Sequence, residues 1–191
     1  LCINLSAQVI TSVMDAPYTS ISHNGVYSYG NYEDIVLGYN NIDSYVNNRG
    51  ERFLGAVVGP YANRIAGGTY TIGEETYNFP QNNNGQTLHG GLKGLDMVVW
   101  DVVSADETSI VLSYVHADGQ EGMPGNLEIK MTYTLTPDNE FKVSYLATTD
   151  KATHVNISHH SFFNLKGEGN GTVNDNVLYI NASKTTPVDA V

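Results

Sequence analysis

The chain has a single cysteine, Cys2, and few basic residues, and these two shortages exclude several classes of protein. One thiol cannot form an internal disulfide or a cysteine-based zinc site. Only nine lysines and arginines stand against 20 aspartates and glutamates, which gives a formal charge of -11. Such a chain repels phosphate backbones and anionic membrane surfaces, so we expect neither a nucleic-acid partner nor a membrane partner.

Targeting signals and several common catalytic motifs are also missing. The chain begins Leu1-Cys2-Ile3-Asn4, without a methionine, a basic leader or an apolar run long enough to cross a membrane. It has no Gly-x-Ser-x-Gly elbow, His-Glu-x-x-His pair, Cys-x-x-Cys pair or Gly-x-x-x-x-Gly-Lys loop. Without a targeting signal in view, we expect a cytoplasmic protein. Because the start of the chain looks cut, a periplasmic or secreted location stays open.

The residues that are present predict a folded chain built from strands. Of 191 residues, 41% are hydrophobic and 10% aromatic, which is enough for a sizeable core. Residues 127–135 alternate between apolar and polar side chains, and the alternation resumes from Phe141 after a turn. Two further hairpins are predicted, from 69–72 with 76–79 and from 98–103 with 109–116. Residues 41–46 are too few for a stable amphipathic helix, so the sequence predicts an all-β fold in which residues 1–191 form one domain or part of one.

Six histidines in an acidic chain invite a metal-site hypothesis, but strand geometry argues against it. His159 and His160 are neighbours and should point to opposite faces of a strand. His154 shares a face with His160 but lies roughly 20 Å away, at about 3.3 Å per residue. We therefore expect no bound metal.

The same alternation predicts a polar row on one face of this strand. Val155 and Ile157 should face the interior, and the opposite face should carry His154, Asn156, Ser158 and His160. A polar row on a sheet suits a sugar ligand. Spacing alone, however, favours the simpler interpretation, the solvated face of an antiparallel strand.

Three other positions have both a structural and a functional interpretation. His89 precedes two glycines, which would leave its ring accessible and let another backbone segment come close, although a turn histidine fits equally well. Arg64 lies in an apolar neighbourhood, where a buried ion pair is favoured over a donor fork for ligand hydroxyls. Asp118 and Glu121 could form a glycosidase-like carboxylate pair, but their loop, rich in glycine and proline, is explained at least as well as a structured connector.

Taken together, several blocks resemble the aldose 1-epimerase (galactose mutarotase) family over nearly the whole chain. The blocks are 34–39, 59–66, 88–94 with Trp100, 118–127, 149–153 and 156–165. The resemblance implies a large twisted antiparallel β-sandwich, incomplete here, which agrees with the strands predicted above. It also implies an isomerase of hexose metabolism that interconverts the α and β anomers of sugars such as galactose and glucose.

The resemblance assigns roles to four residues. His160 matches the family's catalytic acid, His89 its second active-site histidine, Arg64 a sugar-binding arginine and, less closely, Asn63 a residue of the same pocket. In anomer exchange, a base removes the proton of the C1 hydroxyl while an acid delivers one to the ring oxygen, so no cofactor or metal is expected. Histidine suits the acid because its reference pKa, about 6.5, allows donation and recovery near neutrality.

The chain also departs from the family pattern. Pro60 stands where many members have arginine and His159 where many have asparagine, which predicts altered pocket edges. The family's catalytic glutamate and a sugar-binding aspartate fall beyond Val191, so we expect the isolated chain to be nearly inactive and prone to aggregation. Two alternatives stay open: a non-catalytic sugar-binding β-sandwich module, and a relative of the hexose-phosphate epimerases, which the scarcity of basic residues makes the weaker choice.

Overall fold

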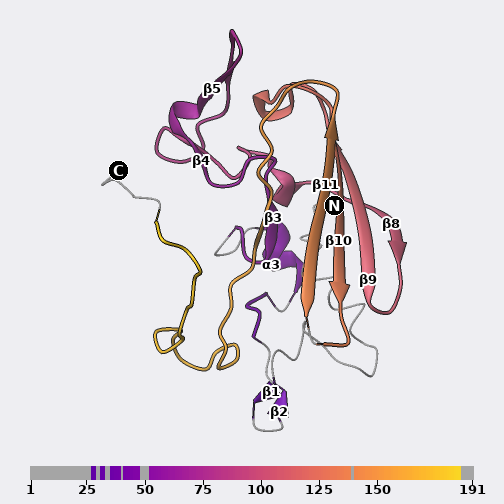
Figure 1. Ribbon diagram of the computed structural model, residues 1–191, viewed down its shortest axis with the longest axis vertical. Helices are drawn as coiled ribbons and strands as arrows, with labels where there is room; N and C mark the ends of the chain where they lie inside the picture. Colours follow the sequence, from indigo (N-terminus) through magenta and orange to yellow (C-terminus); the bar gives the residue numbers. More distant parts are fainter. Residues whose placement is uncertain are drawn as a thin grey trace.

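Strands dominate the computed structural model, which describes residues 27–28, 31–32, 35–39, 41–47, 52–138 and 140–185. The interpretations of Cys2, of the first residues and of the chain beyond 185 lie outside these ranges. The all-β prediction is confirmed (Figure 1) by these elements: β1 (Tyr27–Ser28), β2 (Asn31–Tyr32), α3 (Ile42–Val46), β3 (Ala56–Val58), β4 (Arg64–Ile65), η1 (Ala66–Gly68), β5 (Thr69–Ile72), β6 (Glu75–Asn78), β7 (Thr87–Leu88), η2 (Leu95–Met97), β8 (Asp101–Ala105), β9 (Ser109–His116), η3 (Gln120–Gly122), β10 (Leu127–Leu135), β11 (Phe141–Thr149) and β12 (Ser158–His160).

The largest unit is a four-stranded antiparallel sheet in the order β11-β10-β9-β8. The predicted hairpin between β10 and β11 is confirmed, with Leu127 opposite Thr149 and Leu135 opposite Phe141. The hairpin of β8 with β9 and that of β5 with β6 are confirmed as well. Turn chemistry and period-two alternation are both local signals, which is why the sequence alone identified these pairs.

The core lies on one face of this sheet. The odd-numbered residues of β10 from Leu127 to Tyr133 are buried and the even-numbered residues between them are more exposed, as the alternation predicted, whereas Leu135 at the end of the strand is half-buried. Leu127, Ile129, Met131 and Tyr133 are each at most 3% exposed, and they pack with residues that include Trp100. Burying each such side chain contributes about 1.5–3 kcal/mol, so this face is the main stabilising surface of the described chain.

A short strand pair joins two segments that are far apart in the sequence. β3 pairs with β12 in an antiparallel register that sets Val57 opposite His159 and Ala56 opposite His160. Val57 faces the core of the large sheet, whereas Ala56 and Val58 form a separate small cluster on the other face. The pair therefore separates a packed interior from the side that carries His160.

The strand predicted around His160 is shorter than its sequence alternation suggested. Only residues 158–160 belong to β12, and Asn156 instead forms an isolated parallel bridge with Tyr61. Ile157 packs against the core as predicted, but Val155 is 42% exposed, so its predicted interior position is wrong. Alternation fails there because the chain has left the sheet before residue 158 and no longer has a regular pleat.

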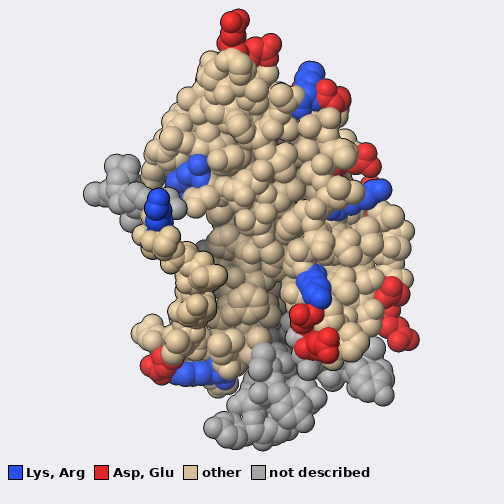
Figure 2. Space-filling view, viewed as in Figure 1, with Lys and Arg blue, Asp and Glu red and all other residues tan. Residues whose placement is uncertain are grey.

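The last described segment carries an unusual apolar surface. Val177, Leu178, Tyr179 and Ile180 are 93%, 81%, 86% and 65% exposed. The segment runs apart from the strands in Figure 1 and stands away from the rest of the chain over part of its length in Figure 2. Within the described ranges, no helix is both long enough and apolar enough to span a bilayer.

Candidate active site

The β4–β7 pair brings Asn63 and His89 together. Arg64 lies opposite Leu88, so the residue before β4 meets the residue after β7. The His89 N–H donates to the Asn63 carbonyl at 3.0 Å, and the Asn63 N–H donates to Nδ1 of His89, also at 3.0 Å. Both residues adopt a positive φ, 64° and 52°, and this reciprocal pair of hydrogen bonds helps to hold that uncommon conformation.

This hydrogen bond fixes the tautomer of His89. Because a backbone N–H donates to Nδ1, that nitrogen must carry its lone pair, and the proton of the neutral ring resides on Nε2. The neutral His89 ring therefore has its N–H at Nε2, on the side away from Asn63.

His160 lies beside this ring although it comes from the other end of the described chain. The two imidazole centroids are 5.1 Å apart and the ring planes are nearly perpendicular, at 86°. Phe53 contacts both rings, with centroids 4.7 Å from His89 and 5.8 Å from His160, and Phe162 lies 5.1 Å from His160. The half-buried His160 ring thus sits among aromatic rings, which limit its contact with water.

Arg64 has an exposed side chain and lies next to Asn63, which binds His89. Its Nε donates to Oδ1 of Asn83 at 3.1 Å, and Nη1 donates to Oδ1 of Asn63 at 3.4 Å. The predicted buried ion pair is wrong, because the side chain is exposed and both of these partners are neutral amides. A guanidinium has five N–H donors, so several remain for the hydroxyls of a ligand.

Gly90 explains how the His89 loop reaches its place. A Cβ at Gly90 would lie only 1.8 Å from the carbonyl oxygen of Gly59, at the end of β3. That same oxygen accepts the Leu95 N–H at 3.0 Å. The predicted close approach of another backbone beside His89 is confirmed, and only glycine permits it.

Comparison with known proteins identifies the relatives of this site. A family model described as aldose 1-epimerase matches residues 25–191. The chain belongs to the aldose 1-epimerase family. Its family relatives include the galactose mutarotase of Bos taurus, 40% identical over 164 residues, which are 85% of this chain and 46% of that protein. The aldose 1-epimerase of Escherichia coli strain K12 is 35% identical over 189 residues, 99% of this chain and 54% of that protein.

Solved structures agree with this aldose 1-epimerase assignment. A GalM/aldose epimerase homologue from C. elegans matches with a TM-score of 0.68 and 32% identity, over 72% of this chain and 42% of that one. The galactose 1-epimerase from Lactobacillus acidophilus NCFM matches with a TM-score of 0.62 and 34% identity, over 70% and 40%. The fold class predicted from the sequence is thereby confirmed, and the chain spans about half the length of the curated relatives it matches.

Two further histidines of this aldose 1-epimerase segment, His159 and His154, have separate surroundings. His159 points away from His160, as predicted, and packs on Tyr133 and Phe141 with centroids 5.5 and 5.8 Å away. Burial, with a smaller contribution from His160, lowers the pKa of His159 to about 4. The prediction that His159 alters a pocket edge is therefore wrong, because its ring lies in the interior. His154 packs edge-on against a tyrosine ring of β5.

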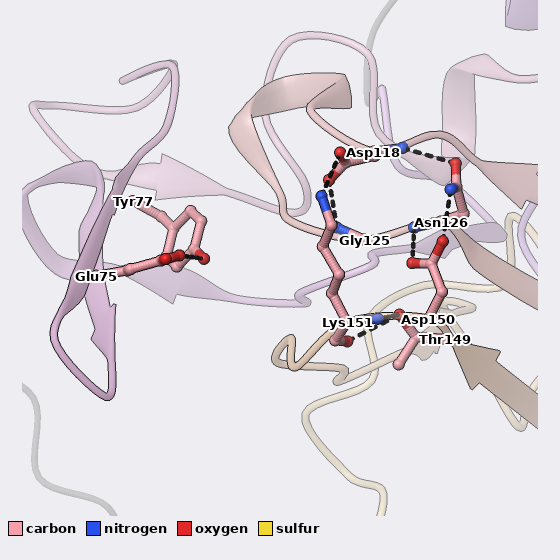
Figure 3. Close-up of polar contacts among 8 residues, drawn as sticks. All are labelled: Glu75, Tyr77, Asp118, Gly125, Asn126, Thr149, Asp150 and Lys151. Atoms are coloured by element: carbon pink, nitrogen blue, oxygen red, sulfur yellow. Dashed lines mark hydrogen bonds and ion pairs between the residues drawn. The ribbon is translucent and has the colours of Figure 1, made fainter.

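Asp118 anchors a loop, and its surroundings support the structured-connector interpretation (Figure 3). It accepts hydrogen bonds from the Gly125 N–H and from Nζ of Lys151, each at 2.6 Å. The Lys151 bond, followed by the Gly125 bond, lowers the pKa of Asp118. Asp150 binds the backbone and side-chain N–H groups of Asn126 next to it, both at 2.7 Å. These contacts tie the turn after β9 to the end of β11.

Glu121 and Asp118 bind different segments, so they do not form a pair of free carboxylates. Its Oε2 accepts the Leu92 N–H at 2.7 Å, close to the His89 loop. Within the ranges that the structure describes, no group of three metal-ligating side chains is close enough together to hold an ion. Sequence reasoning missed Phe53, because a single aromatic residue before a strand gives no periodic signal.

Proposed function

We propose that this chain carries the acid half of a mutarotase active site, which acts on hexoses such as galactose and glucose. The convergence of His89 and His160, with ring centroids 5.1 Å apart, is the observation that supports it. Asn63 and Arg64 border the same place through the β4–β7 pair. Side chains from three separate sequence blocks thus meet where one sugar ring could contact them all.

In the proposed reaction, His160 donates a proton to the ring oxygen as the bond from C1 to that oxygen breaks. A base removes the proton of the C1 hydroxyl, and a carbonyl forms at C1. After rotation about the C1–C2 bond, the steps reverse and the opposite anomer closes. The family resemblance assigns the base to a glutamate C-terminal to Val191.

His89, Asn63 and Arg64 serve binding and orientation in this proposal. The Nε2–H of His89 can donate to a sugar oxygen, because Nδ1 is already engaged by Asn63. Arg64 is held by two amide oxygens, so its remaining donors have a defined direction. Fixed donors supply proximity and orientation, which complement the proton transfer at His160.

Ring NMR during a galactose titration tests the binding part of the proposal. The His89 and His160 resonances should shift on titration, whereas His154, which packs on Tyr70, is the internal control and should not. His160→Ala should weaken galactose binding, whereas the matched control His154→Ala should leave it unchanged. If saturating galactose leaves both site rings unshifted, the proposal is wrong.

Polarimetry with fresh α-glucose tests the catalytic part. A positioned acid or base typically increases the reaction rate by about 10²–10⁴-fold, so the chain without its base should have almost no mutarotase activity. A rate within about tenfold of that of a complete relative would mean that the base lies within residues 1–191, and Glu121 would be the first candidate.

The alternatives make different predictions in the same assays. A non-catalytic sugar-binding module would show the ring shifts but no rate, even when the missing half is supplied as a second chain. A hexose-phosphate epimerase relative would bind the sugar phosphate more tightly than the free sugar, and the charge of -11 makes this the weaker candidate. The single-domain organisation and the cytoplasmic location stay predictions.

A further inference from the structure

The His89 loop, residues 88–92, is held by side chains from three other segments. The first is Asn82, which contacts the loop at both ends. Its Oδ1 accepts the Leu88 N–H at 2.7 Å, and its Nδ2 donates to the carbonyls of Leu88 and Gly91 at 3.0 and 2.9 Å. One half-buried amide thus fixes the two ends of the turn that carries His89.

Leu92 is held by two side chains of opposite charge. Its N–H donates to Oε2 of Glu121 at 2.7 Å, and its carbonyl accepts from Nη2 of Arg52 at 3.1 Å. Arg52 is itself fixed by Asp96, whose side chain is only 2% exposed, at 2.7 Å. Hydrogen bonds to charged groups are stronger than neutral ones, so both sides of this residue are firmly positioned.

Backbone strain gathers at the same loop. Among the described residues, four other than glycine have a positive φ: Asn63, Asn84, His89 and Glu121. Three of them meet here, since Asn63 binds His89 and Glu121 binds the loop. Strained residues persist where the surrounding structure over-determines them, and they cluster at functional sites.

Gly91 makes room for the Glu121 carboxylate. A Cβ at Gly91 would lie 2.4 Å from Oε2 of Glu121, so any other residue would push the carboxylate from its place. The two residues therefore form a matched pair: a glutamate with φ of 51° reaches in, and a glycine leaves the space for it.

We propose that Glu121 is a positioning residue for His89. By holding the Leu92 N–H, its carboxylate keeps the loop in the conformation in which Asn63 donates to Nδ1 and the His89 proton stays on Nε2. The role of His89 toward a sugar rests on the proposed function, whereas its orientation by Glu121 does not. Glu121 thus acts through the loop and does not take a substrate proton.

The ¹⁵N signals of the His89 ring measure this role, because the two tautomers have distinct shifts. Glu121→Ala removes the acceptor, and the His89 ring should change from one tautomer to a mixture. Glu121→Gln keeps an amide oxygen at the same reach and should restore the Nε2–H tautomer. Glu107→Ala, at an exposed glutamate in the turn between β8 and β9, is the matched control and should change nothing.

A galactose titration on the same samples measures how the Glu121 substitutions change the affinity for the sugar. Misplacing a binding group by about 1 Å can cost up to about 10²-fold, and Asn82 still holds part of the loop. We therefore expect affinity to fall by about tenfold in Glu121→Ala and by less than about threefold in Glu121→Gln. If Glu121→Ala does not fold, Glu121→Asp replaces it, because it keeps the charge but is too short to reach Leu92.

The two proposals fail in different ways. A tautomer change in Glu121→Ala without any galactose binding in the parent chain would overturn the proposed function and leave this inference standing. An unchanged His89 tautomer in Glu121→Ala or Glu121→Asp would overturn the inference. If the parent chain does catalyse mutarotation, loss of that activity in Glu121→Gln with the tautomer retained would also overturn it, because Glu121 would then be the base.

Discussion

Lowering the pH from about 7.5 to about 5 should destabilise this fold through two buried histidines, His116 and His159. His116, at the end of β9, is 1% exposed, and burial lowers its pKa to about 4. Burial and the nearby His160 lower the pKa of His159 to the same value. In both rings Nε2 is buried and has no hydrogen-bond partner in the described structure, so a proton added there would be buried without an acceptor.

The direction follows from proton binding in the two states. An unfolded histidine has a pKa of about 6.5, so between about pH 6.5 and pH 4 the unfolded chain binds more protons than the folded one. Stability therefore falls as the pH drops through this window and levels off below about 4. At about pH 5 each histidine should cost about 2 kcal/mol, or about 4 kcal/mol together. This is a large part of the 5–15 kcal/mol that typically stabilises a domain, as an order-of-magnitude guide.

Urea denaturation at the two pH values measures the effect. Trp100 is the single tryptophan and is 5% exposed, so its fluorescence reports unfolding of the core. His116→Gln and His159→Gln cannot titrate, and each should lose about 2 kcal/mol less than the parent between about pH 7.5 and 5. His154→Gln, at an exposed histidine, is the control and should keep the parent's pH dependence.

The lower limit near pH 5 keeps the carboxyl groups whose pKa is lowered in the folded chain out of the comparison. Hydrogen bonds and ion pairs lower the pKa of several of them: Asp106, Asp118, Glu140 and Asp150. Their contribution is lost only as the pH falls below their unfolded values of about 4. If both glutamine variants lose as much stability as the parent, or if either ring protonates near pH 6.5 in the folded chain, the reasoning is wrong.

Three further outcomes follow from the packing. Gly90→Ala should lower the free energy of unfolding by about 3 kcal/mol or more in urea denaturation, because its Cβ would meet a carbonyl oxygen at 1.8 Å. The control Gly73→Ala, which has open space around it, should cost only about 1 kcal/mol. Arg52→Met should cost about 2–3 kcal/mol at neutral pH and less in acid, because the buried Asp96 loses its partner and its pKa, already raised by burial, rises further; thermal unfolding at two pH values checks this. Leu178→Lys should reduce aggregation in light scattering, since that side chain is 81% exposed within an apolar segment, and an unchanged rate would place the aggregating surface elsewhere.

Much of the fold could be predicted from the sequence, because the informative signals were local. The alternation in β10 identified the buried residues from Leu127 to Tyr133, and turn residues located three hairpins. The same logic correctly set His159 and His160 on opposite faces. It failed at Val155, where the chain had left the sheet, since a side-chain period holds only while the strand continues.

The candidate site also has features that the sequence predicted and features that it did not. The residue types and their blocks pointed to His89, His160, Asn63 and Arg64 through a family resemblance, and the glycine after His89 correctly predicted a close backbone. Spacing favoured an ion pair for Arg64, but the structure shows an exposed side chain held by amide oxygens. A sequence pattern can indicate an apolar neighbourhood in the chain, but it cannot say which side chains surround a residue in space.

The sequence by itself determined the strands and turns of three hairpins and the opposite faces of His159 and His160, because these depend on neighbours within a few residues. Only the tertiary structure decided that His89 and His160 meet, since their contact requires β3 to pair with β12 as well as β4 with β7. It also decided that Glu121 binds the loop that carries His89. Long-range pairing depends on which strand edges and buried faces fit one another, and alternation along one strand carries no record of its partner.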